Sequence, residues 1–377
     1  MSIEEYFDAN GFRSKDETGK SWTELGEMFQ LTDEAARSRM RRHWAAKAAR
    51  QEHLVLRSEW QAQGKGGEVI ILRSYRNQPE LTQLTKEDIE EVTLKHMVLR
   101  DEVELVPRDN AMVAELEVHA IGDVHIGMCS EDNQFHLHWN LEELYKRADK
   151  VVDFIRDQDA VQCLVFGGDI CDGQHSRTTR GLKGSSGHQL PQSLGDKEQI
   201  DESCRFITYL LDKFSARCRQ VRCLFVCNSN HGGILDYAVG RIMEAVCPHR
   251  YPGRVHWQNQ LAFMECREFG NHLLAVTHGY DEQYLMRSWP RFLGKEHERF
   301  VEKVMRMHPG NGKNRLLLRF DLHQYTDVRY DYFRDIVCPA FSNPSSWVSL
   351  NFGSDYKGGY VKLHLGESNI TKELIEF

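Results

Sequence analysis

The chain has 377 residues, of which 41% are hydrophobic and 28% are charged, a composition typical of a globular protein rather than a disordered one. No stretch approaches the roughly 18 consecutive apolar residues of a membrane-spanning helix. The first residues, MSIEEYFDANGF, are acidic where a signal peptide is basic and then apolar, so we expect a cytoplasmic protein without a membrane partner. The net charge of −8 argues against general affinity for nucleic acids, which would need a local basic patch.

The sequence pattern over residues 21–50 predicts two short helices. Ser21 and Glu24 fit a capping box, S-x-x-E, before an apolar stripe. A second helix is expected to begin at Thr32, because acidic residues fill its first turn. The apolar stripe of the first helix consists of Trp22, Leu25, Met28 and Phe29, and that of the second consists of Ala36, Met40, Trp44 and Ala48.

This helical segment is strongly basic at its second half, since residues 35–50 hold six Lys or Arg and no acid. It resembles the helix-turn-helix of bacterial transcription regulators, in which the second helix reads DNA. The resemblance implies that phosphates or base edges are contacted by Arg37, Arg39, Arg41 and Arg42. The stretch at 64–76 would supply a wing. The alternative is a basic solvated helix in a module that binds a protein partner.

The rest of the chain alternates between strand-like and helix-like runs. Buried strands are predicted over 114–121, 161–166 and 221–226, with helices over 141–158 and 197–217 between them. A second sheet is predicted from 261–268, 271–277 and 314–320. The sequence therefore predicts an α/β protein with a small N-terminal helical module over 1–76, a connector with a helix near 86–99 over 77–110, and a large domain over 111–377.

Polar side chains follow five of the strand-like runs. In chain order they are Asp123 and His125, then Asp169 and Asp172, then Asn230 and His231, then His278, and last Asp321 and His323. Alternate residues of an extended chain point to the same side, so the first two side chains are expected to lie together at the end of a strand. Carboxylate and imidazole ligands together suit Mn²⁺, Fe²⁺, Zn²⁺ or Co²⁺.

In this order, the residues resemble the motifs of the calcineurin-like metallophosphoesterase superfamily, D-x-H, G-D-x-x-D, G-N-H-D/E, a single His and G-H-x-H. The resemblance covers roughly residues 115–345. It implies a two-sheet βαβ sandwich flanked by helices. It also implies two divalent transition-metal ions, with Mn²⁺ favoured over Fe²⁺, Zn²⁺ or Co²⁺, and hydrolysis of a phosphoester by a hydroxide held between them.

The resemblance also assigns roles to individual residues. One metal would be held by Asp123, His125, Asp169 and His323, and the other by Asp169, Asn230, His278 and Asp321. His231 would act on the leaving oxygen of the phosphate, and Asp172 would orient it.

Three positions depart from the motifs. Ser229 stands where the third motif has Gly, Gly232 stands where it has an acid, and Asp321 stands where the last motif has a His. Because Asp is a competent ligand for hard divalent ions, we expect an altered metal preference at the site.

The sequence leaves three classes of function open. D-V-H-I-G at 123–127 matches the D-x-H-x-G of SbcD-type DNA nucleases, and Arg177, Arg180 and Lys183 of a basic loop would hold a polyanion. We favour a DNA nuclease of a phage or mobile element, with DNA as its partner. One alternative is a small-molecule phosphatase or cyclic-nucleotide phosphodiesterase. The other is a DNA-binding regulator whose metal-binding domain does not catalyse a reaction. Whether the chain forms a homodimer stays open.

Disulfides and structural zinc are not expected, although the chain has ten cysteines. None of them forms a C-x-x-C pair. Cys163, Cys223 and Cys227 lie inside apolar runs, where a thiol behaves as a small buried hydrophobe.

Overall fold

The computed structural model describes residues 3, 6, 20–29, 31–32, 36, 40, 54–63, 69–77, 85–97, 116–128, 130, 138–155, 161–173, 192–269, 271–280, 288–308, 314–344, 357–367 and 369–377. The chain divides into two compact units, Met1–Pro79 and Glu80–Phe377. Among the helices described, none combines the length and the apolar character that crossing a membrane requires.

The first unit contains helix α2 (Trp22–Met28) and an antiparallel hairpin of β1 (Leu54–Gln63) and β2 (Val69–Asn77). The predicted capping box is confirmed, because the N–H of Ser21 donates to Glu24 Oε2 at 2.7 Å and the N–H of Glu24 donates to Ser21 Oγ at 3.2 Å. A small buried cluster is formed by Ile3, Leu25, Ala36 and Met40.

Parts of the N-terminal prediction differ from the structure or lie outside it. Of the apolar stripe predicted for the first helix, Leu25 belongs to this small cluster, whereas Met28 is 49% exposed. Trp44, Ala48 and the four arginines Arg37, Arg39, Arg41 and Arg42 lie outside the described residues. The helix-turn-helix therefore stays a prediction.

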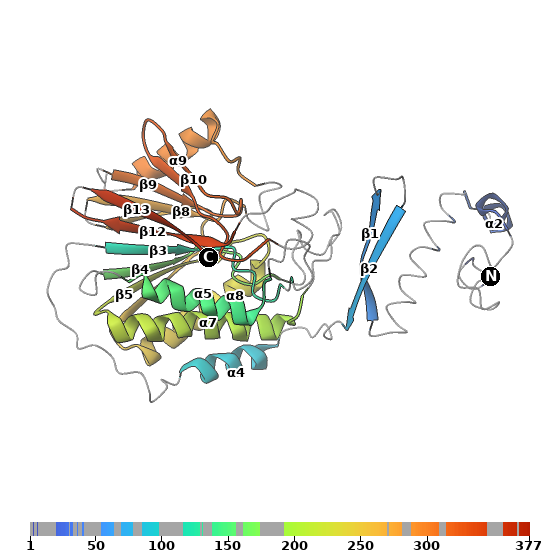
Figure 1. Ribbon diagram of the computed structural model, residues 1–377, viewed down its shortest axis with the longest axis horizontal. Helices are drawn as coiled ribbons and strands as arrows, with labels where there is room; N and C mark the ends of the chain where they lie inside the picture. The colour runs from blue at the N-terminus through green and yellow to red at the C-terminus, as the bar shows by residue number, and fades with distance from the viewer. Residues whose placement is uncertain are drawn as a thin grey trace. The chain divides into compact units, whose positions relative to one another are not determined.

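The second unit is built around two sheets (Figure 1). The first sheet has the order β13-β12-β3-β4-β5-β6 and the second has the order β10-β11-β9-β8-β7. The strands of the first sheet are β3 (Leu116–Ile121), β4 (Val161–Phe166), β5 (Val221–Val226), β6 (Val255–Gln260), β12 (Gly359–Leu365) and β13 (Ile370–Glu376). Those of the second are β7 (Glu265–Phe269), β8 (His272–Thr277), β9 (Asn314–Arg319), β10 (Thr326–Arg329) and β11 (Arg334–Val337).

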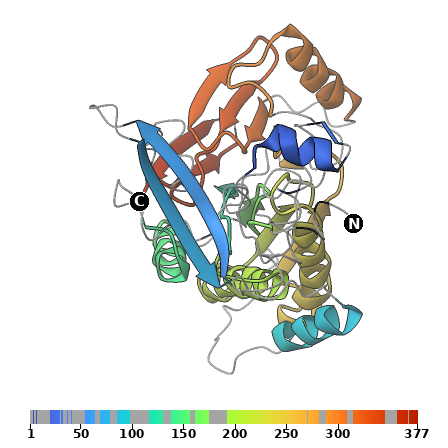
Figure 2. The same ribbon diagram turned by 90° about the vertical axis from the view of Figure 1, so that its right-hand side faces the viewer.

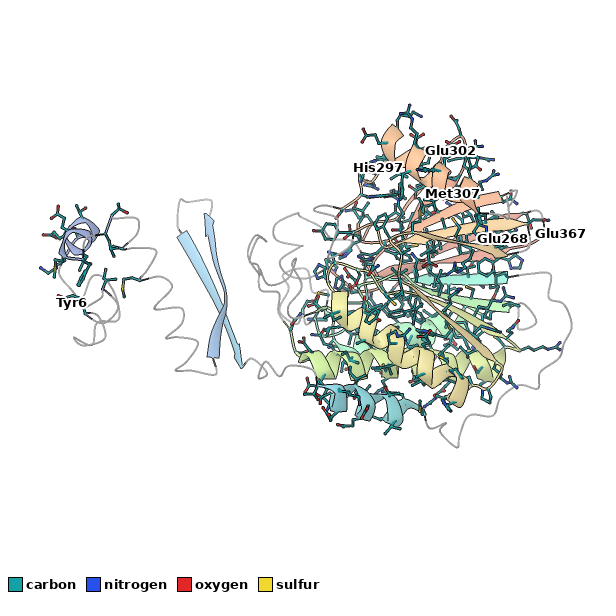
Figure 3. The ribbon with its side chains drawn as sticks, turned by 180° about the vertical axis from the view of Figure 1, so that it is seen from behind. Tyr6, Glu268, His297, Glu302, Met307 and Glu367 are labelled. Carbon is teal, nitrogen blue, oxygen red and sulfur yellow. The ribbon has the colours of Figure 1, made fainter. Side chains whose placement is uncertain are left out.

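Helices cover both outer faces of the pair of sheets, so that the layers are α/β/β/α (Figures 1 and 2). The first sheet is covered by α5 (Leu141–Asp153), α7 (Asp196–Arg217) and α8 (Gly233–Arg250), with α4 (Lys86–Met97) against α7 and α8. The second sheet is covered by α9 (Lys295–Met307). Figure 3 marks His297, Glu302 and Met307 on α9, whose buried residues include Val301 and Met305.

Three hydrophobic cores hold these layers together. One lies between the first sheet and its helices, one lies between the two sheets, and one lies between the second sheet and α9. Strands β3 and β4 are buried along their whole length because they contribute side chains to two of these cores, as parallel strands covered on both faces do. The predicted two-sheet α/β architecture is therefore confirmed.

The bounds of several individual elements also agree closely with those predicted from the sequence. The strands predicted over 161–166 and 221–226 coincide with β4 and β5, and the helix predicted over 197–217 is α7. The helix predicted inside the connector is α4, which packs with the second unit. All nine cysteines in the described segments are buried, including Cys163, Cys223 and Cys227, for which burial was predicted.

Phe320, directly after β9, braces two loops of the first sheet. A Cβ atom at Gly122 would lie 2.3 Å from its ring, and one at Gly167 would lie 2.2 Å from it. Since Phe320 is 1% exposed and belongs to the core between the sheets, only glycine at these positions lets the ring fit. The ring thus fixes the loops that follow β3 and β4 against the second sheet.

We expect Phe320→Ala to lower the free energy of unfolding by about 3–5 kcal/mol, because the substitution opens a cavity between the two sheets. Urea unfolding followed by circular dichroism measures the change. Phe292→Ala is the control, since Phe292 is 62% exposed and its loss should cost less than about 0.5 kcal/mol. Equal effects of the two substitutions would contradict the bracing role of Phe320.

Candidate metal centre

The polar residues predicted at strand ends come together where the carboxyl ends of parallel strands from both sheets meet. Strands β3, β4 and β5 supply them from the first sheet, and β8 and β9 supply them from the second. Three sets of side chains in this region have their ligand atoms within 4.8 Å of one another. They are Asp123, His125 and His323; Asp123, Asp169 and His278; and His125, Asp172 and His231.

The first motif does not have the extended backbone expected from the sequence. Strand β3 ends at Ile121, and Asp123 and His125 have φ angles of 51° and 52°. Their backbone is held by the loop after β4, because the N–H of Asp123 donates to Gly168 O at 3.0 Å and the N–H of His125 donates to Asp169 O at 2.9 Å. The two side chains do share one site, but pairing between loops, and not strand alternation, places them there.

Left-handed backbone conformation is concentrated in this region. Within the described part of the chain, the residues other than glycine with positive φ are Asp123, His125, Asp169, Asp321 and His323. Such a conformation costs on the order of 1–3 kcal/mol for each residue and collects at functional sites, where the surrounding structure enforces it. All five residues belong to the set that the sequence motifs had predicted as metal ligands.

Three ligand atoms converge on one side of the site. The Nε2 atoms of His125 and His323 lie 3.4 Å apart, and His323 Nε2 lies 3.4 Å from Asp123 Oδ1. Asp123 and His125 are buried, whereas the side chain of His323 is 20% exposed. Two imidazole nitrogens and a carboxylate oxygen at this spacing form a partial coordination shell for one divalent ion.

A second convergence lies around His278. Its Nδ1 lies 2.9 Å from the carbonyl oxygen of Gly167, so that Nδ1 carries the proton and Nε2 is left to coordinate. His278 Nε2 lies 2.8 Å from Asn230 Oδ1, 3.2 Å from Asp169 Oδ2 and 3.9 Å from Asp321 Oδ1. The sequence had predicted the same four residues for the second metal.

Asp169 has one oxygen committed to the backbone and one directed into the site. Its Oδ1 accepts hydrogen bonds from the N–H groups of His231 at 2.8 Å and Gly232 at 3.1 Å. Its Oδ2 is buried and accepts no hydrogen bond from the described residues. Oδ2 is therefore the oxygen of Asp169 that is available to hold a metal.

Asp172 contacts two histidines rather than one. Its Oδ1 lies 3.1 Å from His125 Nδ1 and 3.6 Å from His231 Nδ1, and its Oδ2 accepts from the side-chain amide of Gln192 at 2.7 Å. The sequence had assigned Asp172 to His231, but its nearer histidine is His125. By accepting from His125 Nδ1, the carboxylate leaves Nε2 of that ring to coordinate.

His231 occupies the more open side of the site. Its side chain is 18% exposed, and its ring lies edge-on to that of His125 with centroids 4.8 Å apart. Burial alone would lower the pKa of His231, but the carboxylates of Asp169 and Asp172 outweigh it and raise this pKa to about 9. In the metal-free protein the imidazole therefore carries a proton at neutral pH.

The acids of the site differ from two other buried acids of this fold in the residues that pair with them. Two buried acids elsewhere in the fold have a basic partner, Asp335 with Arg319 at 2.6 Å and Glu117 with Lys362 at 2.8 Å. For the site acids, every ion-pair partner among the described residues is a histidine. These acids are Asp123, Asp169, Asp172 and Asp321.

The donor set fits two divalent cations. Four carboxylates carry a charge of −4 when ionised, which two divalent ions would neutralise, and a buried charge without a partner is costly. Burial accordingly raises the pKa of Asp321, whose Oδ2 accepts no hydrogen bond from the described residues. Asp321 thus offers an oxygen where the last motif of the superfamily has a His.

Some residues near the site were missed by the sequence motifs, and others cannot be placed. Gln192 holds Asp172, and Asp236 accepts from Ser229 Oγ at 2.8 Å. Gln192 carries no sequence signal, whereas Asp236 is the first acid after the incomplete third motif. Arg177, Arg180 and Lys183 lie outside the described residues, so their part in holding a polyanion stays a prediction.

No family model matches the sequence, and no curated protein matches it either. Solved structures that match include a conserved uncharacterised protein of Streptococcus pneumoniae described as a predicted phosphoesterase, with 12% identity over 71% of this chain and 91% of that chain and a TM-score of 0.31. Vps29 of Entamoeba histolytica in complex with Zn²⁺ has 10% identity over 69% of this chain and 98% of that chain, with a TM-score of 0.32. PhoD has 9% identity over 71% of this chain and 70% of that chain, with a TM-score of 0.34. At this level of similarity, the chemistry has to be inferred from the side chains themselves.

We expect Asp169→Asn to weaken the binding of two Mn²⁺ ions at least tenfold, about 1.4 kcal/mol for each site, because the carboxylate of Asp169 lies with His278 on one side and with Asp123, which also groups with His125 and His323, on the other. Isothermal titration calorimetry of the metal-free protein measures this change. Asp153→Asn is the matched control, since the Asp153 side chain is 72% exposed. Unchanged binding of two ions by Asp169→Asn would show that the carboxylate is not shared between them.

Proposed function

We propose that the chain is a phosphodiesterase that depends on two divalent metal ions and hydrolyses DNA. The observation that carries the proposal is the group of acids Asp123, Asp169 and Asp321, which have left-handed backbone conformations and no Lys or Arg partners in the described structure. They are interleaved with His125, His278 and His323. When bound, two such ions supply Lewis acidity that activates water and neutralises the charge of a phosphate. The remaining steps belong to the side chains of the chain itself.

His231 is suited to act on the leaving oxygen of a phosphodiester. Its backbone N–H is tied to Asp169 Oδ1, which fixes the residue beside the ligands, and its side chain is partly exposed. Asp172 lies 3.6 Å from Nδ1, so it favours a proton on that nitrogen and directs Nε2 away from the acid. A protonated Nε2 would donate to the departing alkoxide as a general acid.

The preference for DNA rests on the distribution of charge along the chain. Residues 1–76 hold 13 Lys or Arg against 12 Asp or Glu, so that with a total of −8 the remaining residues carry about −9. Phosphate contacts by Lys and Arg supply most of the non-specific affinity for DNA. A domain as acidic as 77–377 would therefore depend on the basic segment 35–50 to stay on DNA.

A panel of substrates tests the proposed reaction. Purified protein with Mn²⁺ is offered labelled single- and double-stranded DNA, RNA, a cyclic nucleotide and a small chromogenic phosphomonoester. Cleavage of DNA supports the proposal. Turnover of the monoester or the cyclic nucleotide alone would replace DNA with a small substrate, and tight DNA binding without any turnover would indicate a regulator instead of an enzyme.

His231→Ala and Asp172→Asn should separate proton transfer from metal binding. We expect His231→Ala to lower the rate on a small chromogenic phosphodiester by roughly 10²–10⁴ without loss of metal. Asp172→Asn should lower the rate and also weaken Mn²⁺ binding about 10- to 100-fold, because Asp172 lies closer to His125 than to His231. Metal content is measured by mass spectrometry after gel filtration. Loss of metal in His231→Ala would make His231 a ligand and remove it as the acid.

A separate prediction concerns recognition of DNA. Replacing Arg37, Arg39, Arg41 and Arg42 together by Gln should weaken DNA binding and reduce its salt dependence, because each lost phosphate contact removes roughly 0.9 from the log–log slope. Hydrolysis of the small phosphodiester should be unchanged.

The matched control for this variant replaces two exposed arginines of the second unit, Arg241 and Arg306, by Gln. It should leave both DNA affinity and its salt dependence near those of the wild type. If the fourfold variant binds DNA with the wild-type slope, the DNA surface lies elsewhere, and the N-terminal unit is a candidate for protein contacts.

A further inference from the structure

Gly232 is a glycine for reasons of space and not of backbone conformation. Its φ and ψ are −65° and −44°, values that any residue adopts in a helix. A Cβ atom at Gly232 would lie 2.2–2.4 Å from Cγ and both carboxylate oxygens of Asp236. Because real Cβ contacts are never this short, the side chain of Asp236 occupies the room that a side chain at 232 would need.

Asp236 lies in the first turn of α8 and is completely buried. Its Oδ1 accepts from the N–H of Cys171 at 2.9 Å, and its Oδ2 accepts from the N–H of Ile170 at 3.2 Å and from Ser229 Oγ at 2.8 Å. A short side chain held by three hydrogen bonds cannot move aside without a large cost in free energy. Hydrogen bonds to an ionised acceptor are also the stronger kind.

These three donors belong to the two loops that carry central ligands of the metal centre. Ile170 and Cys171 directly follow Asp169, and Ser229 directly precedes Asn230. Ser229 Oγ in turn accepts from the N–H of Gly233 at 3.3 Å, which ties the same group to the start of α8. One carboxylate therefore joins the loop after β4 to the loop after β5.

We propose that Asp236 is the positioning residue of the metal centre and that its carboxylate stands in for the acid that the third motif lacks at Gly232. Positions 232 and 236 are then alternative places for one carboxylate, and they lie four residues, or about one helical turn, apart. We call this the exchange. Asp236 acts through Asp169 and Asn230 and does not itself reach the site. The consequence for metal binding rests on the proposed function, whereas the exchange itself is a property of the fold.

A double-mutant cycle tests the exchange. Asp236→Ala should lower the Tm and weaken Mn²⁺ binding about 10- to 100-fold, the usual effect of losing a residue that supports metal ligands. Gly232→Asp alone should lower the Tm, because its Cβ meets the carboxylate of Asp236. The combined variant Gly232→Asp/Asp236→Ala should recover both the Tm and the Mn²⁺ affinity relative to Asp236→Ala, since the cavity now admits a carboxylate from position 232.

An isosteric variant keeps the test informative if Asp236→Ala does not fold. Asp236→Asn fills the same space but loses one acceptor oxygen, so it should weaken Mn²⁺ binding, and Gly232→Asp should not rescue it. Phe333→Ala, in the core under α9, serves as the reference for a variant that lowers the Tm while leaving Mn²⁺ affinity unchanged. The Tm is measured in chelator by differential scanning fluorimetry, and affinity is measured by calorimetry.

The outcomes separate this inference from the proposed function. Rescue of the Tm and of Mn²⁺ affinity by the combined variant supports it. Additive losses in the cycle, or Asp236 variants that bind Mn²⁺ as the wild type does, would overturn it even if the wild type cleaves DNA. Conversely, rescue of both properties in a protein that cleaves no phosphoester would uphold the exchange and contradict the proposed function.

Discussion

Four carboxylates gathered without a Lys or Arg among their described partners, at the junction of two sheets, are the constraint on which this structure depends. Two buried acids elsewhere in the fold, Asp335 and Glu117, are neutralised by a basic residue, as Asp335 is by Arg319. At the junction, the ion-pair partners of Asp123 and Asp169 in the described chain are histidines, which are also the neighbours that a divalent ion would take as ligands. The stability of this region would therefore be coupled to the binding of cations, as in other sites where ligand binding and folding share free energy.

The backbone around the site shows how the fold supports this arrangement. Five ligand-type residues, Asp123 and His323 among them, have left-handed φ angles that are unfavourable in isolation. They are held by contacts from outside their own loops. The ring of Phe320 presses on the loops after β3 and β4, and the carboxylate of Asp236 joins the loops after β4 and β5. Structural support and chemical function are thus supplied by different residues.

Much of this could be predicted from the sequence because it depends on patterns along the chain. The apolar runs at 161–166 and 221–226 became β4 and β5, since a strand buried on both faces needs no alternation, and the residues after such strands had to meet at one edge. The conformation of Asp123 could not be predicted, because pairing with Gly168 and Asp169 sets it from a distance. The close approach of the Asp236 carboxylate to Gly232 was equally hidden, since a glycine with ordinary helical angles carries no sign of what fills its space.

The most direct test of the two-metal centre is anomalous diffraction from crystals grown with Mn²⁺, recorded on both sides of the manganese absorption edge. Two peaks are expected about 3.5–4 Å apart, one beside His125 and His323 and the other beside His278 and Asn230, with Asp169 Oδ2 in contact with both. A single peak, or two peaks that leave Asp169 without a metal contact, would contradict the two-metal centre.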